Sequence, residues 1–237
     1  MQGAGRIRIR SQGWETMNQT VRYKSTADYA TAEIQRLILN GDLLPGAKID
    51  QIELAAQLDV SRHPVRQAIE RLAERGFLLL NPHHSAVVAE ISTRDLEELY
   101  SARSHLERWA VRESWPKFTP DFRKQIVAIQ QTLDQIDPKI DLDGYMRANR
   151  AFHLAMYEPC GNRHMLRTIT MMFDLSERYQ RTALTHTARM KRSRADHADM
   201  VAAITHKDRT RLIELIDEHN GGTKAAVEAH IKSLTKS

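Results

Sequence analysis

LDVSRHPVRQAIERLAERG, residues 58–76, is the stretch of sequence from which the fold can be worked out. Four of its apolar residues recur at positions i, i+3, i+4 and i+7, a spacing typical of a helix with one buried face. They are Val65, Ala68, Ile69 and Leu72. Ser61 is a favoured N-cap whose hydroxyl can accept from a free backbone N–H, and Gly76 suits the left-handed position that often follows a helix. The stretch therefore predicts a helix between these two residues.

The opposite face of this helix is polar. It carries Ser61, Arg62, His63 and Arg66. Helix N-termini expose unpaired backbone N–H groups, and arginine side chains bind both phosphates and guanine edges, so this face is typical of a DNA recognition helix. A solvated polar face without a partner is the alternative, and the flanking sequence decides between the two.

The flanking segments favour DNA binding. Upstream, residues 50–58 begin with Asp50, a favoured N-cap, and continue with helical apolar spacing, so a turn of three or four residues separates two helices. Downstream, two apolar, β-prone runs at 77–80 and 86–91 surround a turn-prone segment. Helix, turn, helix and β-hairpin in this order predict a winged helix-turn-helix domain.

These segments resemble the winged helix of the GntR family of bacterial transcription regulators. The resemblance rests on NGDLLPGAKID (40–50), on LAAQLDVSRHPVRQAIERL (54–72) and on the hairpin that follows. It implies a domain that binds double-stranded operator DNA.

The resemblance also assigns roles to single residues. It implies that Arg62 and Arg66 contact base edges or phosphates, and that the wing tip, His84 and Ser85, enters the minor groove. His63 stands where the family often has threonine, and Ser85 where the wing usually has glycine. These two departures bear on the operator sequence and on the depth to which the wing inserts.

Composition limits the class of protein. The chain has 237 residues, 41% of them hydrophobic, which is enough for two modest domains, and it has no apolar run as long as a membrane span. A single cysteine, Cys160, excludes an internal disulfide and any multi-cysteine zinc site, as is typical of the cytoplasm. We therefore expect a cytoplasmic protein with no membrane partner.

The net charge of +5 and the pI near 9.4 are compatible with nucleic-acid binding. Residues 25–90, however, hold nine acidic and six basic residues, so the case for DNA binding depends on where the arginines lie. Residues 1–24 are basic, contain glycines and lack the apolar core of a signal peptide. They predict a flexible basic tail, which either contacts phosphates or is simply disordered.

We expect three segments: the tail at 1–24, the winged helix-turn-helix at 25–91, and an all-helical domain at 92–237. After Ser92 the sequence has almost no strand signal, and prolines and glycines divide it into helices. The expected helices are 93–115, 119–135, 141–157, 162–187, 193–206 and 208–233. The predicted fold class is mainly α, an N-terminal winged helix with a small hairpin wing joined to a C-terminal helical bundle.

Three of the eleven histidines are spaced as metal ligands. Asn149 and His153 lie at i and i+4 on one predicted helix. His197 and His219 lie eleven residues on either side of Asp208, the predicted turn, so antiparallel helices would bring both imidazoles to the same height. Convergence on one divalent ion is one reading, and histidines satisfied within the bundle core are the other.

The second domain resembles the effector-binding FCD domain of the FadR subfamily of GntR regulators. The resemblance rests on STRDLEELYSARSHLE (92–107), ANRAFHLAMYEPCGN (148–162) and DHADMVAAITHKDRTRLIELIDEH (196–219). In many members an aspartate and three histidines hold a divalent metal. The corresponding residues here are Asn149, His153, His197 and His219.

Asparagine in place of aspartate removes one negative charge from this metal site, which should weaken binding of an ion such as zinc or nickel. The family's metal often helps to bind a small carboxylate effector together with an arginine of the domain's first helix, here Arg103. The alternative for Arg103 is a surface ion pair with Glu107 at i+4.

Together these features predict a bacterial transcription regulator, a repressor whose operator binding is controlled by a small carboxylate effector in a metal-containing helical cavity. A homodimer is expected because one short helix reads only a few base pairs.

The main alternative is a metal-dependent hydrolase fused to a DNA-binding module. Against it, the only carboxylates near the histidines in sequence are Asp196 and Glu218, and no nucleophile motif accompanies them, so we expect no enzyme. A DNA-binding architectural protein without an effector is a third possibility.

Overall fold

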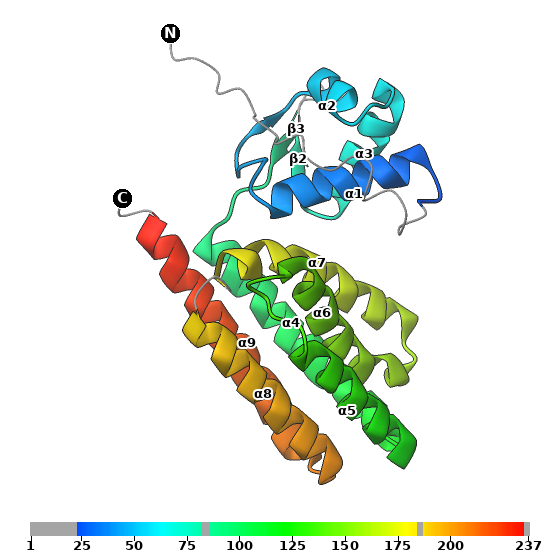
Figure 1. Cartoon of the computed structure of the whole chain (residues 1–237), viewed down its shortest axis with the longest axis vertical. Coiled ribbons are helices and arrows are strands. Elements are labelled where there is room, and N and C mark those ends of the chain that lie inside the picture. The colour runs from blue at the N-terminus through cyan, green and yellow to red at the C-terminus, as the bar shows by residue number, and fades with distance from the viewer. Residues whose placement is uncertain (1–22, 82–85, 184–186, 235–237) are drawn as a thin grey trace. The chain divides into compact units, whose positions relative to one another are not determined.

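The computed structural model describes residues 23–81, 86–183 and 187–234. The chain divides into two compact units, Met1–Glu90 and Ile91–Ser237, a division one residue away from the expected domain boundary. Each unit has its own buried core. Figure 1 shows the helices and strands of both units.

The first unit contains three helices: α1 (Thr26–Leu39), α2 (Gln51–Gln57) and α3 (Arg62–Glu74). Helix α3 packs against both α1 and α2. The apolar face predicted for α3 is fully buried, since Val65, Ala68, Ile69 and Leu72 are all at most 2% exposed. Burial of this face, together with Ile34 and Leu37 of α1, fixes the outward direction of the polar face.

The turn between α2 and α3 is short and locally determined. Asp50 caps α2 by accepting hydrogen bonds from the backbone N–H groups of Ile52 and Glu53. Asp59 adopts a left-handed conformation with φ of 52°, which aspartate tolerates better than most residues. Gly76 ends α3 with φ of 76°, as predicted. Ser61 is the N-cap of α3, but its hydroxyl does not accept the expected hydrogen bond from a backbone N–H of the helix.

A small antiparallel sheet completes the first unit. It consists of β1 (Lys48–Ile49), β2 (Leu78–Leu80) and β3 (Ala86–Val88) in the order β1-β3-β2. Strands β2 and β3 form the predicted hairpin, with Leu79 opposite Val87. Strand β1 was not predicted, because two residues are too few to show a periodic pattern. The predicted wing tip, His84 and Ser85, lies outside the described residues.

The second unit is helical, which confirms the predicted fold class. Its long helices are α4 (Thr93–Ser114), α5 (Pro120–Asp134), α6 (Leu142–Tyr157), α7 (Arg163–Ala183), α8 (Thr187–Thr205) and α9 (Arg209–Leu234). Two 3₁₀ turns, η2 (Trp115–Lys117) and η3 (Glu158–Cys160), follow α4 and α6. None of the described helices has the length and apolar character needed to cross a membrane.

The start predicted for α8 at residue 193 is wrong, since the helix begins at Thr187. Residues 187–192 read TARMKR and lack an apolar stripe, which is why the periodicity did not include them. Arg189 in this first part of the helix is nonetheless buried, through polar contacts with α9. Those contacts depend on residues 30 or more positions away and leave no local signal.

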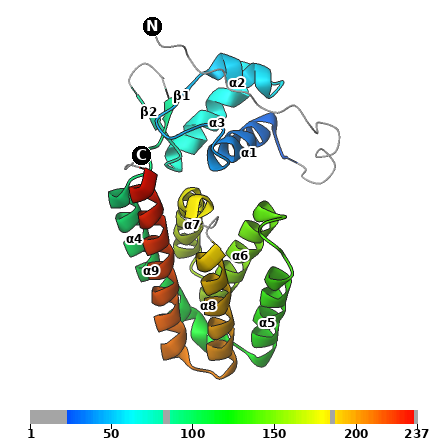
Figure 2. The ribbon, with the colours of Figure 1, turned by 60° about the vertical axis from the view of Figure 1, so that its left-hand side comes forward.

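The helices of the second unit enclose one large apolar core. Figures 1 and 2 both show α8 and α9 running side by side, and α9 also packs against α4 and α7. Helix α5 packs against α6 and α8. Residues of this core that are completely buried include Val111, Ile126, Leu133, Phe152, Met156, Ile169 and Leu212.

Two arginines join α5 to α8 by capping each other's helix. Arg194 of α8 donates to the backbone carbonyls of Asp134 and Ile136, at 2.9 and 2.6 Å, where α5 ends. Arg123 of α5 donates in turn to the carbonyl of Ile204 near the end of α8. Carbonyls at a helix C-terminus have no partner within the helix and carry partial negative charge, so both contacts are favourable.

Candidate functional site

The polar face of α3 is the candidate DNA-binding site. Ser61, Arg62, His63 and Arg66 are all exposed, at the N-terminal end of a helix whose opposite face is buried. Arg66 Nη2 lies 3.4 Å from His63 Nδ1, and its Nε lies 4.0 Å from a carboxylate oxygen of Glu70. With 60% of its side chain exposed, Arg66 is free to exchange the weak Glu70 contact for a phosphate or a base.

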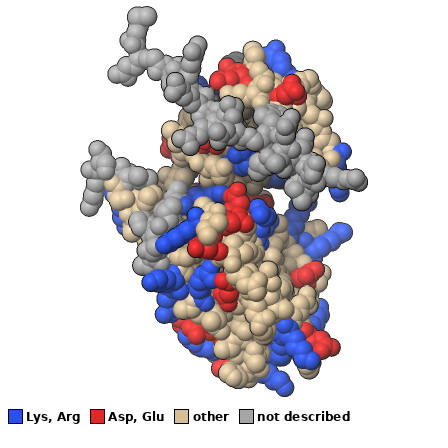
Figure 3. Space-filling view, viewed as in Figure 1, with Lys and Arg blue, Asp and Glu red and all other residues tan. Residues whose placement is uncertain are grey.

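Charge alone does not mark the DNA-binding face. Figure 3 shows basic side chains on both units, with acidic ones among them. Arg62 and Arg66 are distinguished by their position, because they lie at the end of α3 that presents its N-terminal N–H groups.

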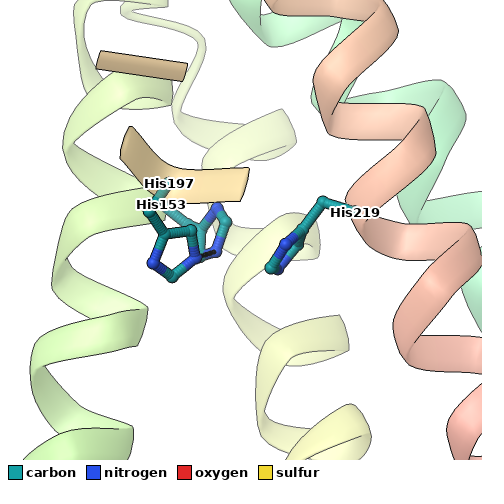
Figure 4. A group of neighbouring side chains, drawn as sticks. All are labelled: His153, His197 and His219. Atoms are coloured by element: carbon teal, nitrogen blue, oxygen red, sulfur yellow. Dashed lines mark hydrogen bonds between the residues drawn. The ribbon is translucent and has the colours of Figure 1, made fainter. Parts of the chain in front are cut away.

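Three histidines from three helices meet inside the second unit. His153 comes from α6, His197 from α8 and His219 from α9, and their side chains converge (Figure 4). One ring nitrogen from each can be chosen so that all lie within 4.8 Å of one another. The symmetric spacing of His197 and His219 about the turn at Asp208 therefore predicted their proximity correctly, with ring centroids 4.9 Å apart.

Within this histidine triad, His153, His197 and His219, one pair of nitrogens has the spacing of two ligands of a tetrahedral ion. The Nε2 atoms of His153 and His197 are 3.2 Å apart. Two nitrogens that bind the same zinc at about 2.0–2.1 Å with tetrahedral angles are roughly 3.3 Å apart. Both Nδ1 atoms are buried and have no hydrogen-bond partner among the described residues, so no protein acceptor fixes a proton on either.

Burial keeps all three imidazoles neutral. Burial lowers the pKa of His153 and of His197 well below the usual value, and the nearby His219 lowers both further. The pKa of His219 is also lowered, mainly by burial, although the hydrogen bond to Asp196 acts in the opposite direction. Neutral imidazoles offer the lone pairs that a metal ion requires.

Asn149 and Arg103 lie in the same buried region. Asn149 is one turn before His153 on α6 and is 7% exposed. Arg103 is buried and not at the surface. Its Nε donates to Glu107 at 2.9 Å and its Nη1 to Ser176 at 2.7 Å. The ion pair with Glu107 therefore exists, but in the interior of the bundle. The positive charge of Arg103 is near enough to lower the pKa of His153.

A second polar group lies behind His219. Asp196 Oδ2 is 3.1 Å from His219 Nδ1 and accepts a hydrogen bond from Arg189 Nη1, also at 3.1 Å. Sequence reasoning noted Asp196 only as a carboxylate near the histidines, and it missed Arg189. The spacing of seven residues places both on one face of a helix, but this signal required α8 to start before residue 189.

Both units match known protein families. Residues 26–88 match the family model "Bacterial regulatory proteins, gntR family", and residues 98–221 match the FCD domain. The second match covers about half of the chain and contains Arg103, Asn149 and all three histidines.

Curated relatives are transcription regulators. The HTH-type transcriptional regulator McbR of Escherichia coli is 34% identical over 117 residues, which is 49% of this chain and 53% of McbR. The chain thus spans about half the length of that relative. The HTH-type transcriptional repressor GlaR of E. coli is 22% identical over 77% of this chain and 86% of its own length. Neither family is an enzyme family, which disfavours a hydrolase.

Solved structures show the same fold. A structure of E. coli McbR/YncC superposes with a TM-score of 0.73 at 23% identity, covering 87% of this chain and 99% of that one. A structure of a "putative transcriptional regulator GntR" from Rhodococcus sp. RHA1 superposes with a TM-score of 0.71 at 18% identity, covering 86% of this chain and 97% of that one.

Proposed function

This chain belongs to the GntR family of bacterial transcription regulators, in the branch that carries an FCD domain, and from this premise we propose that it is a cytoplasmic, homodimeric repressor controlled by a small anionic effector. The observation that supports effector control most directly is the buried histidine triad within the FCD domain.

DNA binding would depend on α3. Arg62 and Arg66 would contact base edges or phosphates, with Ser61 and His63 beside them. A helix of 13 residues covers only a few base pairs, so useful specificity requires two copies on two half-sites. The relatives named as repressors support repression rather than activation.

The binding of an effector would depend on the charge of the site around the histidine triad. His153, His197 and His219 with the amide oxygen of Asn149 form a donor set without an anion, and burial keeps the imidazoles neutral. The other buried charges nearby are already paired, Arg103 with Glu107 and Arg189 with Asp196. A divalent ion such as zinc or nickel, when bound, would supply an uncompensated +2 charge and open coordination positions. An anionic effector, a small carboxylate, is the ligand that this balance favours.

Arg103 would connect the effector to the DNA-binding unit. It lies on α4, contacts Ser176 on α7, and stacks 4.0 Å from the centre of the Phe173 ring. Further along α7, the hydroxyl of Tyr179 donates to Asp95 in the first turn of α4, the helix that follows the winged-helix unit along the chain. An effector carboxylate that binds Arg103 would shift the equilibrium between two arrangements of α4 and α7. This shift would change the spacing of the two recognition helices in the dimer.

Calorimetry tests this proposal. Small carboxylic acids are first screened by thermal shift with and without zinc, and the best ligand is titrated into protein stripped by a chelator and then reloaded. We expect markedly tighter binding to the zinc-loaded protein, because the ion supplies the missing positive charge. Equal affinity in both states would refute the metal-bridged site, and the histidines would then be direct hydrogen-bond donors to the ligand.

Asn149→Asp tests the composition of the ligand set. An anionic oxygen at this position neutralises part of the charge of the ion, so we expect zinc to bind at least about tenfold tighter. The effector should bind more weakly to the zinc-loaded variant, because the net positive charge of the site is smaller. Competition with a chromophoric chelator measures the first effect and calorimetry the second. Unchanged zinc affinity would show that residue 149 does not reach the ion.

A further inference from the structure

Nδ1 of His219 faces two neighbours with opposite requirements. Asp196 Oδ2 at 3.1 Å only accepts hydrogen bonds, whereas Arg189 Nη2 at 3.3 Å only donates them. One ring nitrogen cannot satisfy both at once. If Asp196 is the partner, Nδ1 carries the proton and Nε2 keeps a free lone pair, whereas if Arg189 is the partner the proton belongs on Nε2. The choice of partner thus decides whether Nε2 can bind a metal.

The arrangement favours Asp196. The carboxylate is almost completely buried, and its Oδ1 also accepts from Arg192 Nε at 2.8 Å. Guanidinium groups of Arg189 and Arg192 therefore face both oxygens of the carboxylate and stabilise its anionic form. An anion is the better acceptor for an N–H, so His219 gives its Nδ1 proton to Asp196.

Arg189 in turn is held by α9. Its Nη2 donates to the carbonyl of His219 at 3.0 Å and to the hydroxyl of Thr223 at 2.7 Å. A Cβ at Gly222 would lie 3.3 Å from Arg189 Nη1, so the glycine leaves the space that the guanidinium occupies. Glycine inside a helix costs up to about 1 kcal/mol relative to alanine. Arg189 therefore spans α8 and α9 at the level of His219.

We propose that Asp196 and Arg189 are positioning residues of the metal site. Asp196 keeps the proton of His219 on Nδ1, and Arg189 fixes Asp196 and the α9 backbone, so that Nε2 of His219 remains available to an ion held with His153 and His197. The inference rests on the proposed metal-binding function of the triad. It adds two residues that do not touch the ion and that set the affinity through His219.

The tautomer of His219 can be measured without metal. Long-range ¹⁵N–¹H NMR of the full-length, chelator-treated protein reports which ring nitrogen carries the proton, and a His219→Gln variant identifies the signals. We expect the Nδ1–H form in the wild type. In Asp196→Ala the remaining neighbour of Nδ1 is the donor Arg189, so we expect the proton to move to Nε2. Asp196→Asn retains an oxygen that can accept, so it should retain the Nδ1–H form.

Zinc affinity is the second measurement. Competition with a chromophoric chelator should show binding by Asp196→Ala weakened roughly 10–100-fold, and binding by Asp196→Asn weakened less. An Nδ1–H tautomer that persists in folded Asp196→Ala, with zinc affinity unchanged, would overturn the inference while leaving the metal site in place. Absence of zinc binding by the wild type would instead overturn the proposed function. The NMR measurement does not require metal, so it would still show whether Asp196 fixes the tautomer of His219.

A pair of glycine substitutions tests Arg189 without removing a charge. Gly222→Ala pushes on the guanidinium, whereas a Cβ at Gly221 has nothing within 4 Å. Both substitutions favour the helix by a similar amount, so folding is retained in each. We expect zinc affinity to fall severalfold in Gly222→Ala and to stay at the wild-type value in Gly221→Ala. Equal affinity in the two variants would show that Arg189 does not position the site, and this comparison holds even if Asp196→Ala fails to fold.

Discussion

His219→Ala is expected to weaken zinc binding by more than about a hundredfold. Loss of a residue that supports a ligand already costs about 10–100-fold, and loss of the ligand itself should cost more. His153 and His197 would remain as two imidazoles on α6 and α8, too few for a stable site. Metal content after dialysis and chelator competition measure the effect.

The matched control is His206→Ala. His206 is also in the helical unit but is exposed at the end of α8, so its loss removes an imidazole from the same unit without touching the triad. Zinc binding should be unaffected. Because His219 is buried, the variant must also be shown to be folded by circular dichroism. Retention of zinc by folded His219→Ala would exclude the triad as the metal site.

Arg66→Ala is expected to weaken operator binding by about 1–3 kcal/mol, roughly 5–150-fold. The side chain is 60% exposed and makes only weak contacts within the protein, so the fold should be unchanged. Fluorescence anisotropy with an operator identified by selection, at fixed salt concentration, provides the measurement.

Arg75→Ala separates a specific contact from bulk charge. Arg75 is an exposed arginine at the C-terminal cap of the same helix, so both variants lose one positive charge. Its loss should change binding much less, and equally for operator and unrelated DNA. Equal losses in Arg66→Ala and Arg75→Ala would mean that α3 acts only through its charge and is not a recognition helix.

The local sequence pattern was sufficient to predict the structural features that depend on helical periodicity and on symmetric spacing about a turn. The buried stripe of α3 and its end at Gly76 follow from spacing and from one left-handed residue. The meeting of His197 and His219 follows from equal distances to one turn, because antiparallel helices bring such positions to the same level. Both features require only the geometry of a regular helix.

Features that depend on single long-range contacts could not be predicted. Arg189 lies near the start of α8 in a segment with no apolar stripe, and its partners His219 and Thr223 lie 30 and 34 residues away. Arg103 was given two alternatives from sequence, an effector ligand or a surface ion pair. Its actual burial against Glu107 and Ser176 depends on how α7 packs against α4. Periodicity shows which face of a helix is buried, but it does not show which polar side chains are buried with it.

The order of the helices along the chain also has a consequence for newly made molecules. Helix α4 packs against α9, and α9 carries His219, so the helical unit can close only when its last helix has been synthesised. The winged-helix unit is already complete at Glu90, roughly 130 residues before His219. At about 5–20 residues per second, ribosomes need about 6–26 s for that length. During this time a nascent chain has the whole winged-helix unit and an incomplete helical unit, so under the proposed function each molecule would become responsive to an effector only late in its own synthesis.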